Sequence, residues 1–119
     1  MHMTSEAIII EPLDLLASAT ADGAIWSHSS EQLNINLVRL SPGEGIALHI
    51  NSEVDVWCVV VAGEGRLTLG DEEHHISAGQ ACLIPRGIPR SIQALRSPLA
   101  YLSCHRRRAG LMPVGPDER

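Results

Sequence analysis

Residues 45–90 read GIALHINSEVDVWCVVVAGEGRLTLGDEEHHISAGQACLIPRGIPR, and this stretch decides the fold. Short apolar runs alternate in it with breaks that contain glycine or proline. Glycine permits positive φ and proline fixes φ, so these breaks are turns. The runs between them are rich in β-branched residues, which favour strands. Short strands separated by turns about every ten residues are typical of a β-sandwich or a β-barrel.

The same pattern continues on both sides of this stretch. Residues 54–62 are the most apolar run and carry apolar side chains on both faces, as a strand covered on both sides does. In residues 33–40, leucine and isoleucine alternate with asparagine, which indicates a half-buried strand. The strands that we expect are residues 24–28, 33–40, 46–50, 54–62, 66–69, 74–76, 81–84, 90–95 and 99–105.

The chain has 119 residues, which fits one domain with a single core. We assign residues 1–23 to an N-terminal tail that includes an edge strand at residues 8–10 and a short helical turn at residues 13–17. Residues 24–105 form the β-barrel domain, and residues 106–119 form a polar C-terminal tail.

Composition limits the partners. Hydrophobic residues make up 45% of the chain but aromatic residues only 3%, so the core must be built from valine, isoleucine, leucine and alanine. The net charge of -5 argues against nucleic acid, because affinity for phosphate backbones comes from lysine and arginine. No apolar run approaches the roughly 20 residues that cross a bilayer, so we expect no membrane partner. The partners that remain possible are a small molecule and a second copy of the chain.

The cysteines predict a reducing environment. Cys58, Cys82 and Cys104 are odd in number, lack C-x-x-C spacing and lie inside apolar runs. This pattern argues against a disulfide framework, and the N-terminus shows no secretory signal pattern. We therefore expect a cytoplasmic protein.

The turn residues of the central stretch follow a spacing that resembles the first signature motif of the cupin superfamily. That motif is Gly, five residues, His-x-His, three or four residues, Glu, six residues and Gly. Here Pro42-Gly43 leads to His49 at the first histidine position, and Gly63 stands at the closing glycine.

The second cupin motif is Gly, five residues, Pro-x-Gly, two residues and His. Gly79, Pro85 and Gly87 fall at this spacing. The resemblance covers residues 33–105 and implies a single all-β domain, a jelly-roll β-barrel also described as a double-stranded β-helix. Cupins are commonly dimers, so the resemblance also implies a homodimer.

The metal-binding positions of the family do not carry metal ligands here. Cupins that bind a divalent metal usually hold it with the two histidines and the glutamate of the first motif and the histidine of the second. These positions carry His49, Asn51, Val56 and Arg90. Valine has no donor atom and a guanidinium cannot coordinate a cation. We therefore expect no cofactor in this pocket.

An alternative metal site remains open from the sequence. Glu53 and Asp55 flank the position where the family has its glutamate. A rearranged site for iron, manganese, nickel or zinc would combine His49, Glu53 and Asp55.

The resemblance places a pocket inside the barrel. His49 is a candidate acid–base residue, because imidazole titrates near neutral pH. If Arg90 points inward, its buried charge must meet an anion, either Asp55 or Glu53 or a ligand carboxylate or phosphate. The residues expected to line the pocket are His49, Asn51, Val56, Cys58, Val60, Arg90 and Ile92.

Several of the residues singled out here have plainer interpretations. Cys58 is a small buried residue unless a neighbouring cation or histidine lowers its pKa. Trp57 lies on the opposite face of the same strand, where a tryptophan outside the barrel is typical of a subunit interface. His74 and His75 are expected at the surface of a hairpin.

Three functions fit these residues. The first is a cupin-like protein that binds a small polar or anionic organic molecule without a metal, either as a binding module or as an isomerase, epimerase or cyclase with His49 as acid–base. The second is a metal-dependent enzyme of oxygenase or isomerase type with the atypical set around His49. The third is a dimeric structural or interaction protein whose barrel is filled by side chains.

Overall fold

The computed structural model describes residues 6–107. The helices and strands in this part of the chain are α1 (Pro12–Ala17), β1 (Gly23–Ser29), β2 (Leu33–Leu40), β3 (Gly45–His49), β4 (Val56–Ala62), β5 (Glu64–Leu69), β6 (Glu72–Ser77), β7 (Ala81–Ile84), β8 (Arg90–Ala94) and β9 (Leu99–Arg106). The strands form a five-stranded sheet in the order β1-β2-β9-β4-β7 and a four-stranded sheet in the order β3-β8-β5-β6. Every pairing is antiparallel.

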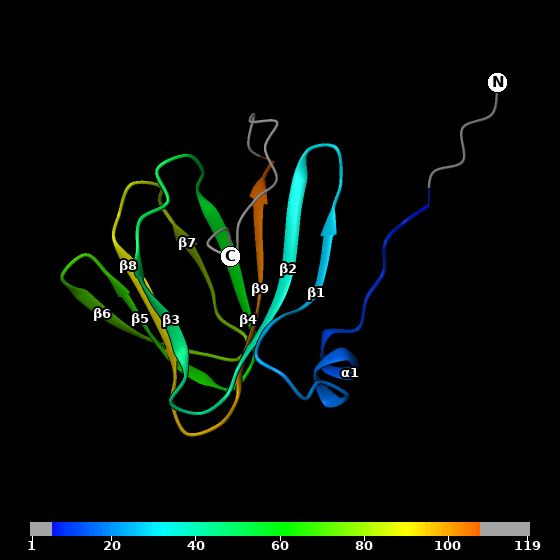
Figure 1. The fold of residues 1–119 in the computed structure, drawn as a ribbon, viewed down its shortest axis with the longest axis horizontal. Coiled ribbons are helices and arrows are strands. Elements are labelled where there is room, and N and C mark those ends of the chain that lie inside the picture. Colours follow the sequence, from blue (N-terminus) through cyan, green and yellow to red (C-terminus); the bar gives the residue numbers. More distant parts are fainter. Residues whose placement is uncertain (1–5, 108–119) are drawn as a thin grey trace.

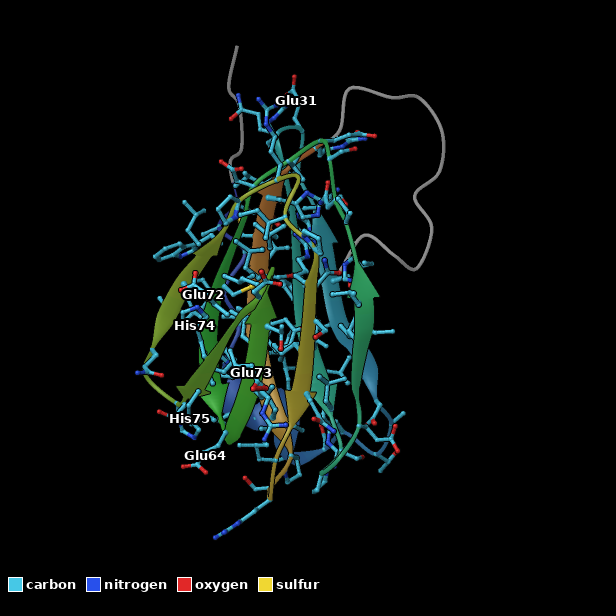
Figure 2. All side chains as sticks on the ribbon, turned by 90° about the vertical axis from the view of Figure 1, so that its left-hand side faces the viewer. Glu31, Glu64, Glu72, Glu73, His74 and His75 are labelled. Carbon is cyan, nitrogen blue, oxygen red and sulfur yellow. The ribbon has the colours of Figure 1, made fainter. Side chains whose placement is uncertain are left out.

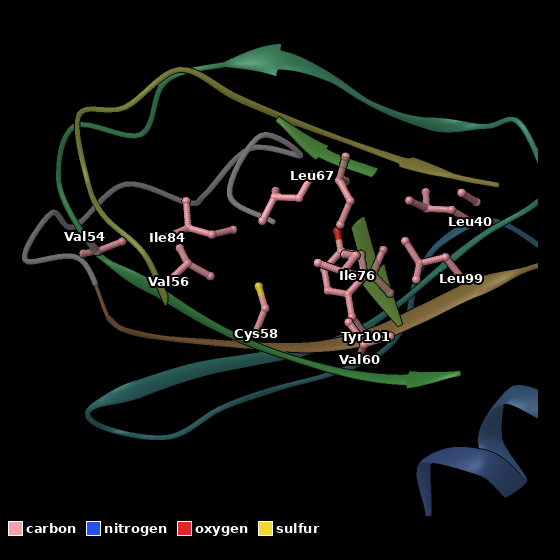
Figure 3. Packing of buried hydrophobic residues seen from close by; sticks show 13 residues of the cluster. Leu40, Val54, Val56, Cys58, Val60, Leu67, Ile76, Ile84, Leu99 and Tyr101 are labelled. Atoms are coloured by element: carbon pink, nitrogen blue, oxygen red, sulfur yellow. The ribbon is translucent and has the colours of Figure 1, made fainter. Parts of the chain in front are cut away.

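The two sheets face each other and enclose the core (Figure 1). Side chains alternate between the two faces of a strand, so every second residue of β4 points inward. Val56, Cys58 and Val60 do so and point toward Leu67 of the opposite sheet (Figure 3). This arrangement confirms the predicted all-β jelly roll.

The predicted strands between residues 24 and 105 are all present, with ends that differ by at most two residues. The helical turn at residues 13–17 is confirmed as α1, which begins at Pro12. Proline suits the first position of a helix, because the backbone N–H that it lacks would have no hydrogen-bond partner within the helix. No helix among residues 6–107 has the length and apolar character needed to cross a membrane.

The expected edge strand at residues 8–10 is wrong. Residues 6–10 form no strand, and Ile8 and Ile9 are 58% and 83% exposed. An apolar run becomes a strand only where it can pair, and here the chain enters α1 at Pro12 instead of running along β1. In the predicted C-terminal tail, Arg106 still belongs to β9, and residues 108–119 lie outside the described residues.

Gly63 occupies a position that admits no side chain. It lies between β4 and β5 with φ at +80°, in the left-handed region that favours glycine. A Cβ atom at Gly63 would lie 2.1 Å from the carbonyl oxygen of Pro98, just before β9. The closing glycine of the first motif is therefore the point where the β4–β5 turn packs against the chain that leads into β9.

Asp22 links the start of β1 to the end of β2 through side-chain hydrogen bonds. Its Oδ1 accepts hydrogen bonds from the Ser41 amide at 2.9 Å, the Ser41 hydroxyl at 2.8 Å and the Arg39 guanidinium at 2.9 Å. The bond from the Ser41 amide is the main cause that lowers the pKa of Asp22. A carboxylate with a lowered pKa in the folded state stabilises that state above its unfolded pKa and loses this contribution as the pH falls through the folded value.

We therefore expect Asp22→Asn to lower the urea midpoint of unfolding slightly at neutral pH. The difference from the wild type should shrink as the pH falls through the lowered pKa of Asp22, because the wild-type carboxyl is then protonated as well. Asp71→Asn, in the exposed β5–β6 turn, removes the same charge and is the control. A deficit that stays constant down to acid pH would contradict this role.

Candidate functional site

Sheet pairing brings the two motifs together at one end of the barrel. His49 is the last residue of β3 and is paired in register with Arg90, the first residue of β8. The Gly87 amide donates a hydrogen bond to the Asn51 carbonyl at 2.7 Å, which links the loops that carry the two motifs. Arg90 is only 4% exposed, so its guanidinium lies inside the protein and not on its surface.

A small cavity lies between the sheets beside this pair. Five of the seven residues expected to line the pocket form part of its wall, namely His49, Val56, Cys58, Arg90 and Ile92. Its free volume is about 20 Å³, which holds about one water molecule. The barrel interior is therefore largely filled by side chains at this end.

The structure places the other two expected residues elsewhere. Asn51 is buried, and its side-chain oxygen accepts hydrogen bonds from the amides of Glu53 at 3.0 Å and Val54 at 3.3 Å. Asparagine commonly closes a turn in this way, so Asn51 shapes the β3–β4 loop. Val60 lies further along β4 and lines a different cavity, between β6 and β7.

Sequence reasoning missed part of the wall. Tyr101 and Ser103 of β9 line the cavity, together with Ile46, Leu67, Ile84 and Ser91. β9 was predicted as a strand, but which of its faces turns inward depends on its register with β4. That register sets Ser103 opposite Cys58. The register between two strands that are distant in the chain cannot be predicted from a local sequence pattern.

Several polar atoms at this end are buried and have no hydrogen-bond partner among residues 6–107. They are Nε2 of His49, Nδ2 of Asn51, Oγ of Ser103 and Nε2 of His105. Most buried polar atoms in folded proteins have a partner, so a group of exceptions indicates a place for a bound molecule or water. His49 and Ser103 both line the cavity.

The hydrogen bonds of His49 define what its free nitrogen can do. Nδ1 lies 2.9 Å from the Ala47 carbonyl oxygen. A carbonyl only accepts, so Nδ1 carries the proton, and Nε2 of the neutral ring is an acceptor. Protonation would convert Nε2 into a donor for an anion. The His49 side chain can therefore either take up a proton from a bound group or, once charged, bind an anion.

The residues at the family's metal positions do not fit a metal ion. His49 is the only imidazole among His49, Asn51, Val56 and Arg90, and it stands next to a permanent cation. Nor does the structure assemble the alternative set. Glu53 and Asp55 are exposed, and Asp55 accepts a hydrogen bond from the Arg86 amide at 2.9 Å. Among residues 6–107, no group of three or more histidine, cysteine, aspartate or glutamate residues could hold a metal.

The remaining singled-out residues lie outside the barrel interior. His74 and His75 are exposed, as predicted, and Figure 2 shows them with Glu72 and Glu73 on the β5–β6 hairpin. Trp57 is 49% exposed on the outer face of β4, and its partner in register on β7, Leu83, is 52% exposed.

Comparisons with known proteins agree with this architecture. The family model described as Cupin domain matches residues 36–104. The Bacillus halodurans protein BH2720 is similar in structure, with a TM-score of 0.75 and 20% identity over 92% of this chain and 86% of that chain. No curated protein matches the chain.

Two further solved structures show the same fold. A Klebsiella pneumoniae protein with a double-stranded β-helix domain has a TM-score of 0.74 and 16% identity, over 89% of each chain. The protein TT1209 from Thermus thermophilus has a TM-score of 0.69 and 26% identity, over 83% of this chain and 97% of that chain.

Proposed function

The chain belongs to the cupin family, and we propose that it binds a small anion, a carboxylate or an oxyanion, at the His49–Arg90 end of its barrel without a metal ion. The observation that carries this proposal is the buried guanidinium of Arg90 in the wall of a cavity that His49 and Ser103 also line with buried polar atoms. Arginine presents a planar set of donors that matches carboxylate and phosphate oxygens. A metal ion at the same place would be repelled.

The volume of the cavity limits the size of the ligand. With about 20 Å³ free, only the charged end of an organic molecule fits without movement of side chains. The rest would extend past His49, which is only partly buried. This size supports a short carboxylate over a larger organic molecule that would be fully enclosed in the barrel.

An enzymatic role is compatible with this proposal. His49 lines the cavity, and its Nε2 is an acceptor that is buried without a hydrogen-bond partner among the described residues. A bound substrate with an acidic C–H or O–H within hydrogen-bond reach would be deprotonated there, as general base catalysis requires. Proton exchange between the bound anion and deuterated solvent, lost on His49→Gln, would distinguish an enzyme from a binding module.

The experiment that tests anion binding is a thermal-shift panel. Sodium acetate, oxalate, malonate, succinate and phosphate are compared with sodium chloride at equal ionic strength. A ligand that binds only the folded state at about 100 times its Kd stabilises it by about 2.7 kcal/mol. We expect a saturable rise in Tm with at least one carboxylate or oxyanion. No rise beyond that with chloride would refute the proposal.

Metal content supplies an independent check. Protein purified without added metal is expected to contain no stoichiometric iron, manganese, nickel or zinc by elemental analysis. A stoichiometric metal that disappears in His49→Ala would overturn the metal-free part of the proposal.

Ser103→Ala is expected to raise stability while it weakens anion binding. The Ser103 hydroxyl is buried without a partner among the described residues, and an unsatisfied buried hydroxyl costs about 1 kcal/mol or more. Urea unfolding and anion titration measure the two effects. Ser27→Ala removes a hydroxyl that donates to the Asn36 side chain at 2.6 Å, so this control should lose stability. A similar loss for Ser103→Ala would show that its hydroxyl is satisfied in the protein.

The small free volume at the His49–Arg90 end favours a second candidate, a dimeric interaction protein. We propose that a second copy covers the outer face around Trp57 and Leu83, because both side chains are large, apolar and about half exposed. Burial of a tryptophan contributes strongly to interface stability. Trp57→Glu should shift the mass measured by light scattering from dimer to monomer. A monomeric wild type would refute the dimer.

A further inference from the structure

Two cysteines face each other across neighbouring strands. Cys58 of β4 and Cys82 of β7 are direct partners in the antiparallel register. Side chains at such positions point to the same face of the sheet, and the Cα atoms of direct partners lie about 4.5–5.5 Å apart. A disulfide spans this distance without movement of the backbone. Both thiols are free in the structure.

The two sulfurs differ in their access to solvent. β7 ends the five-stranded sheet and β6 ends the four-stranded sheet. A cavity of about 360 Å³ opens here, with Cys82 in its wall. We call it the lateral cavity, and the residues that line it are Val60, Leu67, Leu69, His74, His75, Ile76, Gln80, Ala81 and Cys82. Cys82 is half-buried, whereas Cys58 is 5% exposed and lies behind it in the core.

The contact between the two thiols favours the reactive, deprotonated form of Cys82, the more exposed of the two. The hydrogen bond from Cys58 lowers the pKa of Cys82 to about 7, against the opposing effect of burial. The same hydrogen bond, followed by burial, raises the pKa of Cys58. The lowered pKa favours the thiolate form of Cys82, and the thiolate is the nucleophilic form. From the sequence, only Cys58 was a candidate for this role.

We propose that Cys82 and Cys58 form a dithiol site that is oxidised to a disulfide by an apolar organic hydroperoxide bound in the lateral cavity. The cavity lies within the size range of small-molecule sites. Most of its wall is apolar, from Val60, Leu67, Leu69, Ile76 and Ala81, which favours an organic hydroperoxide over hydrogen peroxide. Cys58 and Leu67 also line the cavity of the proposed anion site, but oxidation of the two cysteines does not require a bound anion.

The reaction balances in two steps. The Cys82 thiolate attacks one oxygen of the hydroperoxide, the O–O bond breaks, and the remaining alkoxide takes a proton to leave as an alcohol. Cys82 is oxidised to a sulfenic acid. The Cys58 sulfur then attacks the Cys82 sulfur, the S–O bond breaks, and the hydroxyl leaves as water with the Cys58 proton. The two thiols lose two electrons, which reduce the hydroperoxide.

The test treats the full chain with cumene hydroperoxide, blocks remaining thiols with N-ethylmaleimide and maps the peptides by mass spectrometry. We expect a Cys58–Cys82 disulfide, with Cys104 still alkylated. Cys58→Ser should instead give a Cys82 sulfenic acid that dimedone traps. Cys82→Ser should slow oxidation of the protein at least about tenfold, and Cys104→Ser should behave as the wild type.

Three results would overturn the proposal. They are no Cys58–Cys82 disulfide in the wild type, oxidation of Cys104 as fast as that of Cys82, and oxidation by hydrogen peroxide at the same rate as by cumene hydroperoxide. A measurement on the wild type alone avoids variants that fail to fold. Alkylation of Cys82 by iodoacetamide should reach half its maximal rate near neutral pH, and alkylation no faster than that of Cys104 at this pH would contradict the reactive thiolate.

Discussion

Arg90→Gln is expected to weaken binding of the small anion identified by the thermal-shift panel by about 30-fold or more. Truncating one partner of a buried, hydrogen-bonded charge pair costs about 2–5 kcal/mol, and the Arg90 guanidinium is the buried cation of the cavity wall. Isothermal titration calorimetry with that anion measures the loss. Circular dichroism and the Tm verify that the variant is folded.

Two variants sharpen the interpretation of this result. Arg90→Lys keeps the charge but loses the planar set of donors, so its affinity should lie between those of Arg90→Gln and the wild type. Arg66→Gln removes an arginine whose side chain is half exposed on β5 and paired with Glu73 at 3.4 Å. This control should bind the anion normally. Unchanged affinity in Arg90→Gln would show that the anion binds elsewhere.

Gly63→Ala is expected to destabilise the fold by about 3 kcal/mol or more, because backbone strain and a steric clash act together. An alanine at φ +80° is strained in itself, and its Cβ would lie 2.1 Å from the Pro98 carbonyl oxygen. The β4–β5 turn would have to move away from the start of β9. Urea unfolding measures the change, and a lower yield of folded protein is expected as well.

Gly43→Ala separates the two contributions. Gly43 has nearly the same φ of +81°, but a Cβ there meets nothing within 4 Å. Only the strain remains, so its cost should be about 1–2 kcal/mol. Equal losses in the two variants would mean that the contact with Pro98 contributes nothing.

These two glycines also show how much of the fold can be predicted from the sequence. Spacing alone identifies Gly63 as a motif position and predicts β4 and β5 on either side of it. The reason for the glycine, the Pro98 carbonyl much further along the chain, appears only when β9 is placed beside β4. Strand positions follow from local alternation and turn residues, whereas contacts between distant strands depend on register.

The candidate site follows the same rule. His49 and Arg90 were found from the resemblance to the cupin motifs, and the sheet pairs them. Ser103 was not found, because its inward orientation depends on the β4–β9 register. Asn51 was assigned to the pocket wall, but its side-chain oxygen is used by the amides of its own loop. Cys82 was noted only as one of three cysteines inside apolar runs, whereas the structure places it on β7, the end of its sheet, beside the lateral cavity.

Leu67 contributes to the walls of both cavities. It points inward from β5 toward Cys58, as Figure 3 shows. One leucine side chain therefore borders both a cavity with a positive charge in its wall and a cavity with an apolar wall and a cysteine. Loss of this single side chain would enlarge both cavities at once.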